Sequence, residues 1–427
     1  MFVNKNNFGF FLLCLIILFL PLHYFICEII LSRFMIDNIF RDFVIMCLFV
    51  LITRFKIKKK DMLILICCMI LVLFALFSFF INNYAGTFNV LRTYIVPMLF
   101  YFVCSNFNFT KEKFNFIQKI MVIELALIGI IGLIQAFFLG DDFLVSLGYP
   151  SVDGFLDSSS YYIGGFFGYQ RNIGTFVSPN VCGVALALAV LVHLLEGTNY
   201  IKENRTFILL ILIISLIGTF SRSAIVGALL AVMFISFVKE NSIFKIKISK
   251  KILWLIPAII LVIIFVYLVD LKFLNGIFFK MLASSFLGTI AGTDVSMQGH
   301  IRDLFEPLLT IINNPFGLGF GSNGPMAIGV SATYNVVESS IYLMMFEVGI
   351  LPAIIIFVPY FKLIFDTLKN RIYKYYVPFA VETMILTTYF LLPNIQAYEV
   401  SFYSMMFLGF YYNKSVKEIY TKKLMEE

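Results

Sequence analysis

The sequence predicts an all-α protein, a polytopic integral membrane helical bundle of about twelve transmembrane helices. Of its 427 residues, 61% are hydrophobic and only 13% are charged, a balance that a water-soluble domain of this size could not keep in solution. Apolar runs of about 20 residues recur between charged breaks, and this is the length that a helix needs to cross hydrocarbon. The short alternating strands of a membrane β-barrel do not occur in the sequence.

The apolar runs place the expected helices in order along the chain. The first, 8–30, has no small-x-small cleavage site after it, so we expect a retained helix and not a signal peptide. No internal repeat divides the chain, and 1–427 is expected to form a single integral membrane domain. The predicted spans are 8–30, 38–53, 62–81, 88–104, 115–138, 174–195, 206–219, 222–238, 252–269, 338–365, 376–392 and 396–412.

The breaks between spans differ in charge on the two sides of the membrane. Breaks rich in Lys or Arg, such as 54–61 and 239–251, alternate along the chain, and the positive-inside rule places them and both termini in the cytoplasm. The opposite face receives two long segments, 139–173 and 270–337. The second shows helical periodicity at 271–288 and 302–312, which predicts short interfacial helices. Long segments in a compact membrane protein usually carry function.

Arginine is distributed differently from lysine in this topology. Of the 23 lysines, 21 fall at the cytoplasmic face, whereas six of the nine arginines fall outside. The planar guanidinium fork matches phosphate and carboxylate, so an outward-facing anionic ligand is expected, a phosphate above all. The alternative is that each arginine anchors a helix end or pairs with a carboxylate such as Asp42 or Asp303. The six are Arg33, Arg41, Arg92, Arg171, Arg222 and Arg302.

The alternative is favoured for the first three of these arginines. Arg171, Arg222 and Arg302 instead lie in polar, Gly- or Ser-containing stretches beside the long outer segments or in a tight outer turn. The amino-acid sequence around and after these arginines contains RNIGTFVSPN at 171–180, GTFSRS at 218–223, NPFGLGFG at 314–321 and ESSIYL at 338–343. Glu347 and Gly349 follow on the same predicted helix.

This ordered set, between Arg171 and Leu351, resembles the O-antigen polymerase (Wzy) and O-antigen ligase family. The resemblance implies a GT-C-like membrane glycosyltransferase of the bacterial plasma (inner) membrane, with no metal, no cofactor and no nucleic acid. Polymerases of the family transfer a growing glycan from undecaprenyl pyrophosphate to a lipid-linked repeat unit at the outer leaflet, and a chain-length regulator protein is an expected partner. Family ligases carry a histidine nine residues before the Glu. Glu338 stands at that position here, which favours the polymerase of an O-antigen or capsule.

The chemistry assigns candidate roles to the residues of these stretches. Arg171, Arg222 and Arg302 are expected to stabilise the charge that develops on the departing pyrophosphate. Glu338 is the first candidate for the base that accepts the proton of the attacking hydroxyl, although a helix N-terminal acid explains it equally well. His300 is a rival base, with a solvated loop histidine as its alternative.

Further residues are candidates for binding the saccharide. Tyr169 belongs to an aromatic cluster that could stack on sugar rings or form part of an interfacial belt. Asn180 could bond a sugar or a backbone carbonyl freed by Pro179, and Ser221 and Ser339 complete the substrate-binding set. The glycines of 317–321 lack a following Lys-Ser, so a tight re-entry turn is expected there and not a nucleotide site.

Two rival functions stay open at this level. A ligase acting on lipid A core uses the same donor chemistry. A lipid-linked oligosaccharide flippase is also possible, because twelve helices with both ends inside is a common transporter plan. The short connection between the sixth and seventh spans and the long outer segments favour chemistry at the outer face.

Overall fold

The computed structural model shows a helical membrane-type protein with two very small hairpins. The residues that it describes are 5–30, 39–53, 57–82, 87–149, 151–152, 155–156, 161–163, 169–196, 204–238, 305–324, 337–370 and 376–426.

The first half of the chain contributes seven helices in the described part. Most are nearly uniformly apolar, as expected for helices that contact lipid on one side and other helices on the other. They are α1 (Lys5–Phe19), α2 (Ile39–Thr53), α3 (Met62–Asn82), α4 (Thr87–Asn106), α5 (Lys111–Ile134), the short α6 (Gly140–Leu147) and α7 (Pro179–Glu196).

The second half adds eight described helices. They are α8 (Arg205–Gly218), α9 (Arg222–Val238), the short α14 (Pro307–Asn313), α15 (Ser340–Val348), α16 (Ile350–Asn370), α17 (Tyr376–Leu391), α18 (Tyr398–Tyr412) and the polar α19 (Lys414–Glu426). A short 3-10 turn, Asn394–Gln396, joins α17 to α18.

Five helices in the described part of the chain are long and apolar enough to cross a membrane. They are Lys59–Phe80, Thr87–Asn106, Lys111–Leu147, Pro179–Glu196 and Ile350–Lys369, and shorter apolar helices accompany them. The predicted helical class is therefore confirmed, and these helices are compatible with the predicted membrane protein. The number of about twelve spans stays a prediction, because 252–269 lies outside the described residues and the shorter helices have only 10–17 residues.

Two predicted spans have different boundaries in the structure. The single helix expected over 338–365 is broken into α15 and α16 at Gly349, whose φ of 85° lies in the left-handed region that glycine tolerates. The span expected from 174 begins instead at Pro179, a residue suited to the first turn of a helix. Residues 171–178 before it form an irregular buried turn.

The all-α prediction also missed two hairpins in the first outer segment. Ser151–Val152 pairs antiparallel with Phe155–Leu156, and Tyr162–Ile163 pairs antiparallel with Tyr169–Gln170. Each strand has only two residues, too few to show an alternating pattern in the sequence.

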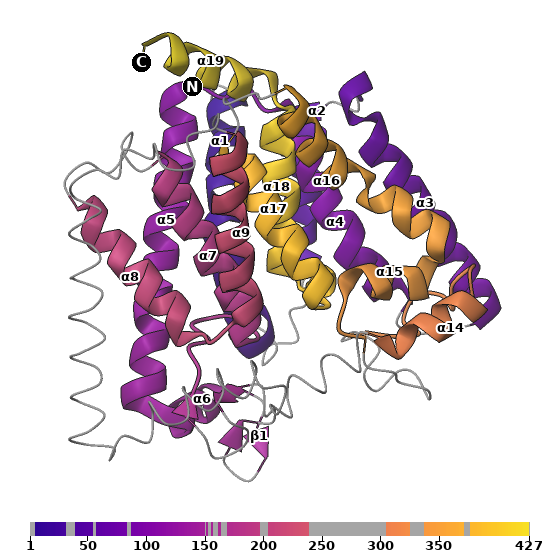
Figure 1. Ribbon diagram of the computed structural model, residues 1–427, viewed down its shortest axis with the longest axis horizontal. Helices are drawn as coiled ribbons and strands as arrows, with labels where there is room; N and C mark the ends of the chain where they lie inside the picture. The colour runs from indigo at the N-terminus through magenta and orange to yellow at the C-terminus, as the bar shows by residue number, and fades with distance from the viewer. Residues whose placement is uncertain are drawn as a thin grey trace.

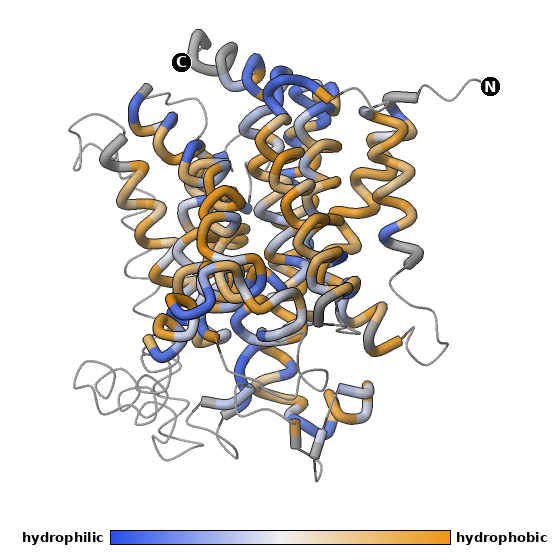
Figure 2. The backbone as a smooth tube through the Cα atoms, turned by 90° about the vertical axis from the view of Figure 1, so that its right-hand side faces the viewer, coloured by the Kyte–Doolittle hydropathy of each residue, from blue (hydrophilic) through white to orange (hydrophobic). Residues whose placement is uncertain are grey.

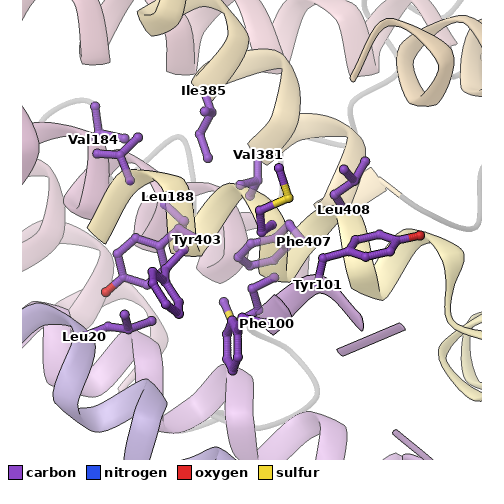
Figure 3. Close-up of a cluster of buried hydrophobic side chains, with 14 of the residues drawn as sticks. Leu20, Phe100, Tyr101, Val184, Leu188, Val381, Ile385, Tyr403, Phe407 and Leu408 are labelled. Atoms are coloured by element: carbon purple, nitrogen blue, oxygen red, sulfur yellow. The ribbon is translucent and has the colours of Figure 1, made fainter. Parts of the chain in front are cut away.

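The core of the bundle forms around α18. This helix packs on α4 and α17, and α17 in turn packs on α9 and α7. Large aromatic side chains fill the space, among them the fully or almost fully buried Tyr101, Tyr403 and Phe407, which Figure 3 shows together with Leu188 of α7 and Ile385 of α17. Because α18 is buried on every side, it is a central helix and not one that faces lipid.

The two ends of the bundle carry different parts of the chain. The N-terminus, the C-terminus and α19 lie at one end, while α6, the hairpin at β1 and α14 lie at the other (Figure 1). Hydrophobic residues dominate between the ends, and hydrophilic stretches gather towards them (Figure 2). The described parts of both long segments thus share the end opposite the termini, as the alternation of charged breaks predicts.

Candidate functional site

The turn at 171–178 is built into the bundle by Asn172. This side chain is fully buried, and its Nδ2 donates to the carbonyl oxygens of Gly129 at 3.3 Å and Ser215 at 3.1 Å. Its backbone N–H donates to Gly218 O at 2.9 Å. The turn therefore connects α5 with the end of α8, which fixes the position of the neighbouring Arg171.

A glycine allows this close approach. A Cβ at Gly132 of α5 would lie only 1.7 Å from Oδ1 of Asn172 and 2.7 Å from the backbone N of Gly174. Gly174 itself has a φ of 56°, in the left-handed region. Gly174, the glycine of the motif RNIG, is thus needed because the backbone at this position adopts a left-handed conformation.

Among the described residues, Thr219 and Asn180 hold the Arg171 side chain. Its Nε donates to Thr219 O at 2.7 Å, and its Nη2 donates to Oδ1 of Asn180 at 3.0 Å. Asn180 lies in the first turn of α7, and Thr219 lies in the turn between α8 and α9. Asn180, predicted to bind a sugar or a carbonyl, therefore orients the guanidinium group.

The turn between α8 and α9 has an unusual backbone. Phe220 adopts a φ of 49°, which costs energy for a bulky residue and marks a position that the surrounding structure determines. The Thr219 hydroxyl accepts a hydrogen bond from Ser221 N at 3.2 Å, and the Ser221 side chain is fully buried. A Cβ at Gly183 of α7 would lie 2.5 Å from Cβ of Ser221, so the turn sits directly on α7.

Arg222, the first residue of α9, follows the turn whose Thr219 carbonyl accepts from Arg171, and its positive charge acts on Arg171. The pKa of Arg171 is lowered to about 10, chiefly by burial and secondly by the positive charge of Arg222. The Arg171 guanidinium group is still charged at neutral pH, since this pKa lies well above 7. Two predicted clamp residues from separate stretches of sequence are therefore brought together, and two neighbouring guanidinium groups are suited to a polyanion such as pyrophosphate.

Ser339 and Glu338 lie in the segment that leads into α15. Oγ of Ser339 donates to Tyr389 O at 3.2 Å, and Oγ of Ser340 donates to Leu392 O at 2.6 Å. These bonds attach the start of α15 to the end of α17. Ser339, expected to bind substrate, has a structural partner, while Glu338 is half-buried just before it.

Several predicted residues fall outside the described part of the chain. Arg302 and His300 lie there, as does Arg33, and the side chains of Tyr169 and Arg41 do as well. Their expected roles stay predictions.

For Arg92 the structure confirms the alternative explanation, that the arginine pairs with a nearby carboxylate. Its Nε lies 3.4 Å from Oδ2 of Asp42, the carboxylate expected as a partner. Tyr398 OH donates to the other oxygen of Asp42 at 3.2 Å, and the Tyr398 ring stacks on His23 with centroids 4.8 Å apart. Arg92 thus belongs to a separate ionic network at the same end of the bundle.

Sequence reasoning missed two members of this network. Nδ1 of His23 lies 3.2 Å from Oε1 of Glu399, and both side chains are buried. Each is an ionisable residue inside a predicted span, a feature that by itself indicates a functional or paired group in a membrane protein.

The glycine-rich stretch forms the re-entry turn that the sequence predicts. Gly317, Gly319 and Gly321 have φ values of 81°, 95° and 80°. The turn wraps around the end of α15, where Leu318 N donates to Phe346 O at 2.6 Å and Gly319 N donates to Glu347 O at 3.1 Å.

No family model and no curated protein matches this chain, so the roles of its residues are inferred from their geometry.

Proposed function

We propose that the protein is a bacterial surface-polysaccharide polymerase of the outer leaflet, a metal-independent glycosyltransferase that uses an undecaprenyl-pyrophosphate-linked donor. The observation that carries the proposal is the pair Arg171 and Arg222. The two guanidinium groups interact although they come from separate stretches, and Arg171 is fixed in place by Thr219 and Asn180. Two guanidinium groups that act on one another and can each form a fork of hydrogen bonds match the two phosphates of a pyrophosphate, which supports a doubly charged ligand.

The location of the pair also supports an outer-face reaction. The turns that hold Arg171 and Arg222 lie towards the end of the bundle that carries α6 and the hairpins, opposite the termini (Figure 1). The lysine-rich breaks are expected at the end of the termini, which would be cytoplasmic. The arginines would then face the leaflet on which lipid-linked repeat units await polymerisation.

The reaction requires little besides charge stabilisation and one proton acceptor. A hydroxyl oxygen of the acceptor repeat unit bonds to the anomeric carbon of the donor glycan as the bond from that carbon to the pyrophosphate oxygen breaks. Negative charge then grows on the departing undecaprenyl pyrophosphate, where Arg171 and Arg222 would stabilise it. The hydroxyl proton passes to a base, for which Glu338 is the candidate among the described residues. Arg302 would join the clamp.

The magnitude of the arginine contribution can be estimated. Removing one preorganised donor from a developing oxyanion typically lowers kcat by about 100- to 1,000-fold. Arg171→Ala also leaves Oδ1 of Asn180 and the Thr219 carbonyl without a donor, which weakens the turn. Arg222→Ala removes charge from the first position of α9 and tests the second member of the clamp.

The test is reconstitution in lipid with the undecaprenyl-pyrophosphate repeat unit of the host. A product ladder of whole repeat units is expected from the wild type, with 100-fold or greater losses in Arg171→Ala and Arg222→Ala, on the order typical of an oxyanion donor. Arg92→Gln is the matched control, because Arg92 is an outer arginine paired with Asp42. Glycan transferred only to lipid A core would indicate a ligase. Unchanged repeat units that move between leaflets would indicate a flippase.

A further inference from the structure

The helix of the first span is broken between Phe19 and Phe25. The α-helix α1 ends at Phe19, a 3-10 turn with Pro21 inside it follows over Leu20–Leu22, and a π-helical segment begins at Phe25. Breaks of this kind leave backbone carbonyl groups without partners inside the helix. In this break the Pro21 carbonyl and the His23 side chain, only two residues apart, bind two different parts of the chain.

The Pro21 carbonyl holds the turn that carries Arg171. Oγ1 of Thr175, a buried residue of that turn, donates to Pro21 O at 2.5 Å. Asn172 attaches the same turn to α5 and α8, and Thr175 adds a contact with the first span. A shift of the break would therefore move the turn and the guanidinium group that the turn positions.

The His23 side chain holds the break against the first turn of α18. Its Nδ1 lies 3.2 Å from Oε1 of Glu399, and its ring stacks on that of Tyr398 with centroids 4.8 Å apart. Both His23 and Glu399 are buried. Because an ionised carboxylate only accepts hydrogen bonds, Nδ1 carries the hydrogen in this pair. A bond from a buried donor to a charged acceptor is stronger than one between neutral groups, and it fixes the break on α18.

The start of α18 is attached in turn to the segment that carries Glu338. Two residues after Glu338, Oγ of Ser340 donates to Leu392 O at 2.6 Å and accepts from Ile395 N at 3.0 Å, on the connection between α17 and α18. Oγ of Ser401 in α18 donates to Ile395 O at 2.6 Å. A continuous set of contacts thus leads from the turn of the donor clamp, through the break and the start of α18, to the segment of the candidate base.

We propose that the pair of His23 and Glu399 sets the distance between the two ends of the proposed reaction centre. The inference rests on the proposed function, in which Arg171 binds the departing pyrophosphate and Glu338 accepts the proton of the attacking hydroxyl. Transfer between two lipid-linked substrates requires the reacting atoms to be held about 3–3.5 Å apart. Both members of the pair are positioning residues, because they connect the supports of the two ends without contacting either substrate.

The alternative is that the His23 ring only fills space beside Tyr398. Two substitutions separate these explanations. His23→Phe keeps an aromatic ring for the stack but removes the Nδ1 donor, whereas His23→Asn removes the ring and keeps an Nδ2 donor, which lies as many bonds from Cα as Nδ1 does. Positioning through the hydrogen bond predicts that His23→Asn is closer to the wild type than His23→Phe, and packing alone predicts the reverse.

The test is amide hydrogen exchange of the purified protein in lipid nanodiscs, measured over peptides that cover 171–178. Exchange should be about tenfold faster in His23→Phe and in Thr175→Val, each of which lacks one bond of the connection, and close to the wild type in His23→Asn. Because the two bonds act in series, the double variant should exchange no faster than either single variant. Tyr398→Phe is the matched control, since it keeps the stack and removes the hydrogen bond to Asp42, and its exchange should match that of the wild type.

Polymerisation in the same nanodiscs is the second measurement. In His23→Phe kcat should fall by about tenfold or more while KM for the repeat unit stays within about twofold, since the substrates still bind but are misaligned. The proposal is overturned if His23→Phe and Thr175→Val exchange over 171–178 as slowly as the wild type, or if His23→Phe is more active than His23→Asn.

Two further outcomes are distinguishable. Should His23→Phe fail to fold, the exchange of Thr175→Val decides alone. A wild type that makes no polymer would overturn the proposed function itself, and the exchange measurement separates that result because it does not depend on activity.

Discussion

Replacing Gly132 with alanine should dislodge the turn that carries Arg171. The added Cβ would lie 1.7 Å from Oδ1 of Asn172 and 2.7 Å from the backbone N of Gly174, so the turn and not a flexible chain end must move. Overpacking of this kind costs about 1–3 kcal/mol. Moving Asn172 also breaks its hydrogen bonds to Gly129 and Ser215, which contribute about 1 kcal/mol each.

The expected loss in the free energy of unfolding is therefore about 3–5 kcal/mol. Thermal unfolding of the purified protein in detergent would measure it. Gly9→Ala is the matched control, because Gly9 also lies in a helix but its nearest neighbour is the end of the Leu51 side chain at 3.3 Å. Alanine there should leave stability within about 1 kcal/mol of the wild type. A Gly132→Ala protein as stable as the Gly9→Ala protein would refute the tight seating of the turn.

Three further predictions follow from the described contacts. Glu399→Gln should lower the free energy of unfolding by about 1–3 kcal/mol, because it removes the buried carboxylate beside His23. Its control is Glu418→Gln, in the exposed pair with Lys414, which should change the free energy of unfolding by less than about 0.5 kcal/mol. The pKa of Arg171, lowered to about 10, stays above neutrality, so pyrophosphate binding should persist from about pH 7 to 9 and weaken as pH rises through the pKa; a decline already complete at neutral pH would contradict this. Asn180→Ala should weaken pyrophosphate binding about tenfold in a titration with the protein still folded, because the Arg171 Nη2 loses its hydrogen bond to Oδ1 of Asn180.

The sequence predicted the helical membrane class because hydrophobicity and charge act over whole segments. The sequence also predicted that the two long outer segments share the end of the bundle opposite the termini, because the alternation of lysine-rich breaks extends along the whole chain. Local breaks were harder to place, since the kink at Gly349 depends on the glycine turn that packs against it. The hairpins at 151–170 were missed because two-residue strands have no periodicity to detect.

The candidate site was predictable in part. The sequence singled out Arg171 and Arg222 because they lie in segments expected on the outer face, where positive charge is disfavoured, and in the structure the charge of Arg222 acts on Arg171. The anchoring role of Asn180 could not be read from the sequence, because its contact with Arg171 depends on how 171–178 folds back on α7. The pairing of His23 with Glu399 joins residues 376 positions apart, a distance in sequence that no local pattern spans.

The central claim is that Arg171 and Arg222 together recognise the pyrophosphate of a lipid carrier. Binding of undecaprenyl pyrophosphate and of undecaprenol to the protein in lipid nanodiscs tests it most directly, because the sugar is not needed. The wild type should bind undecaprenyl pyrophosphate more tightly than undecaprenol. Arg171→Ala and Arg222→Ala should each weaken binding of the pyrophosphate lipid by about tenfold or more, as expected for a lost charge-assisted contact. Arg92→Gln should leave that binding unchanged. Equal affinity for the two lipids, or unchanged binding in both alanine variants, would contradict the account.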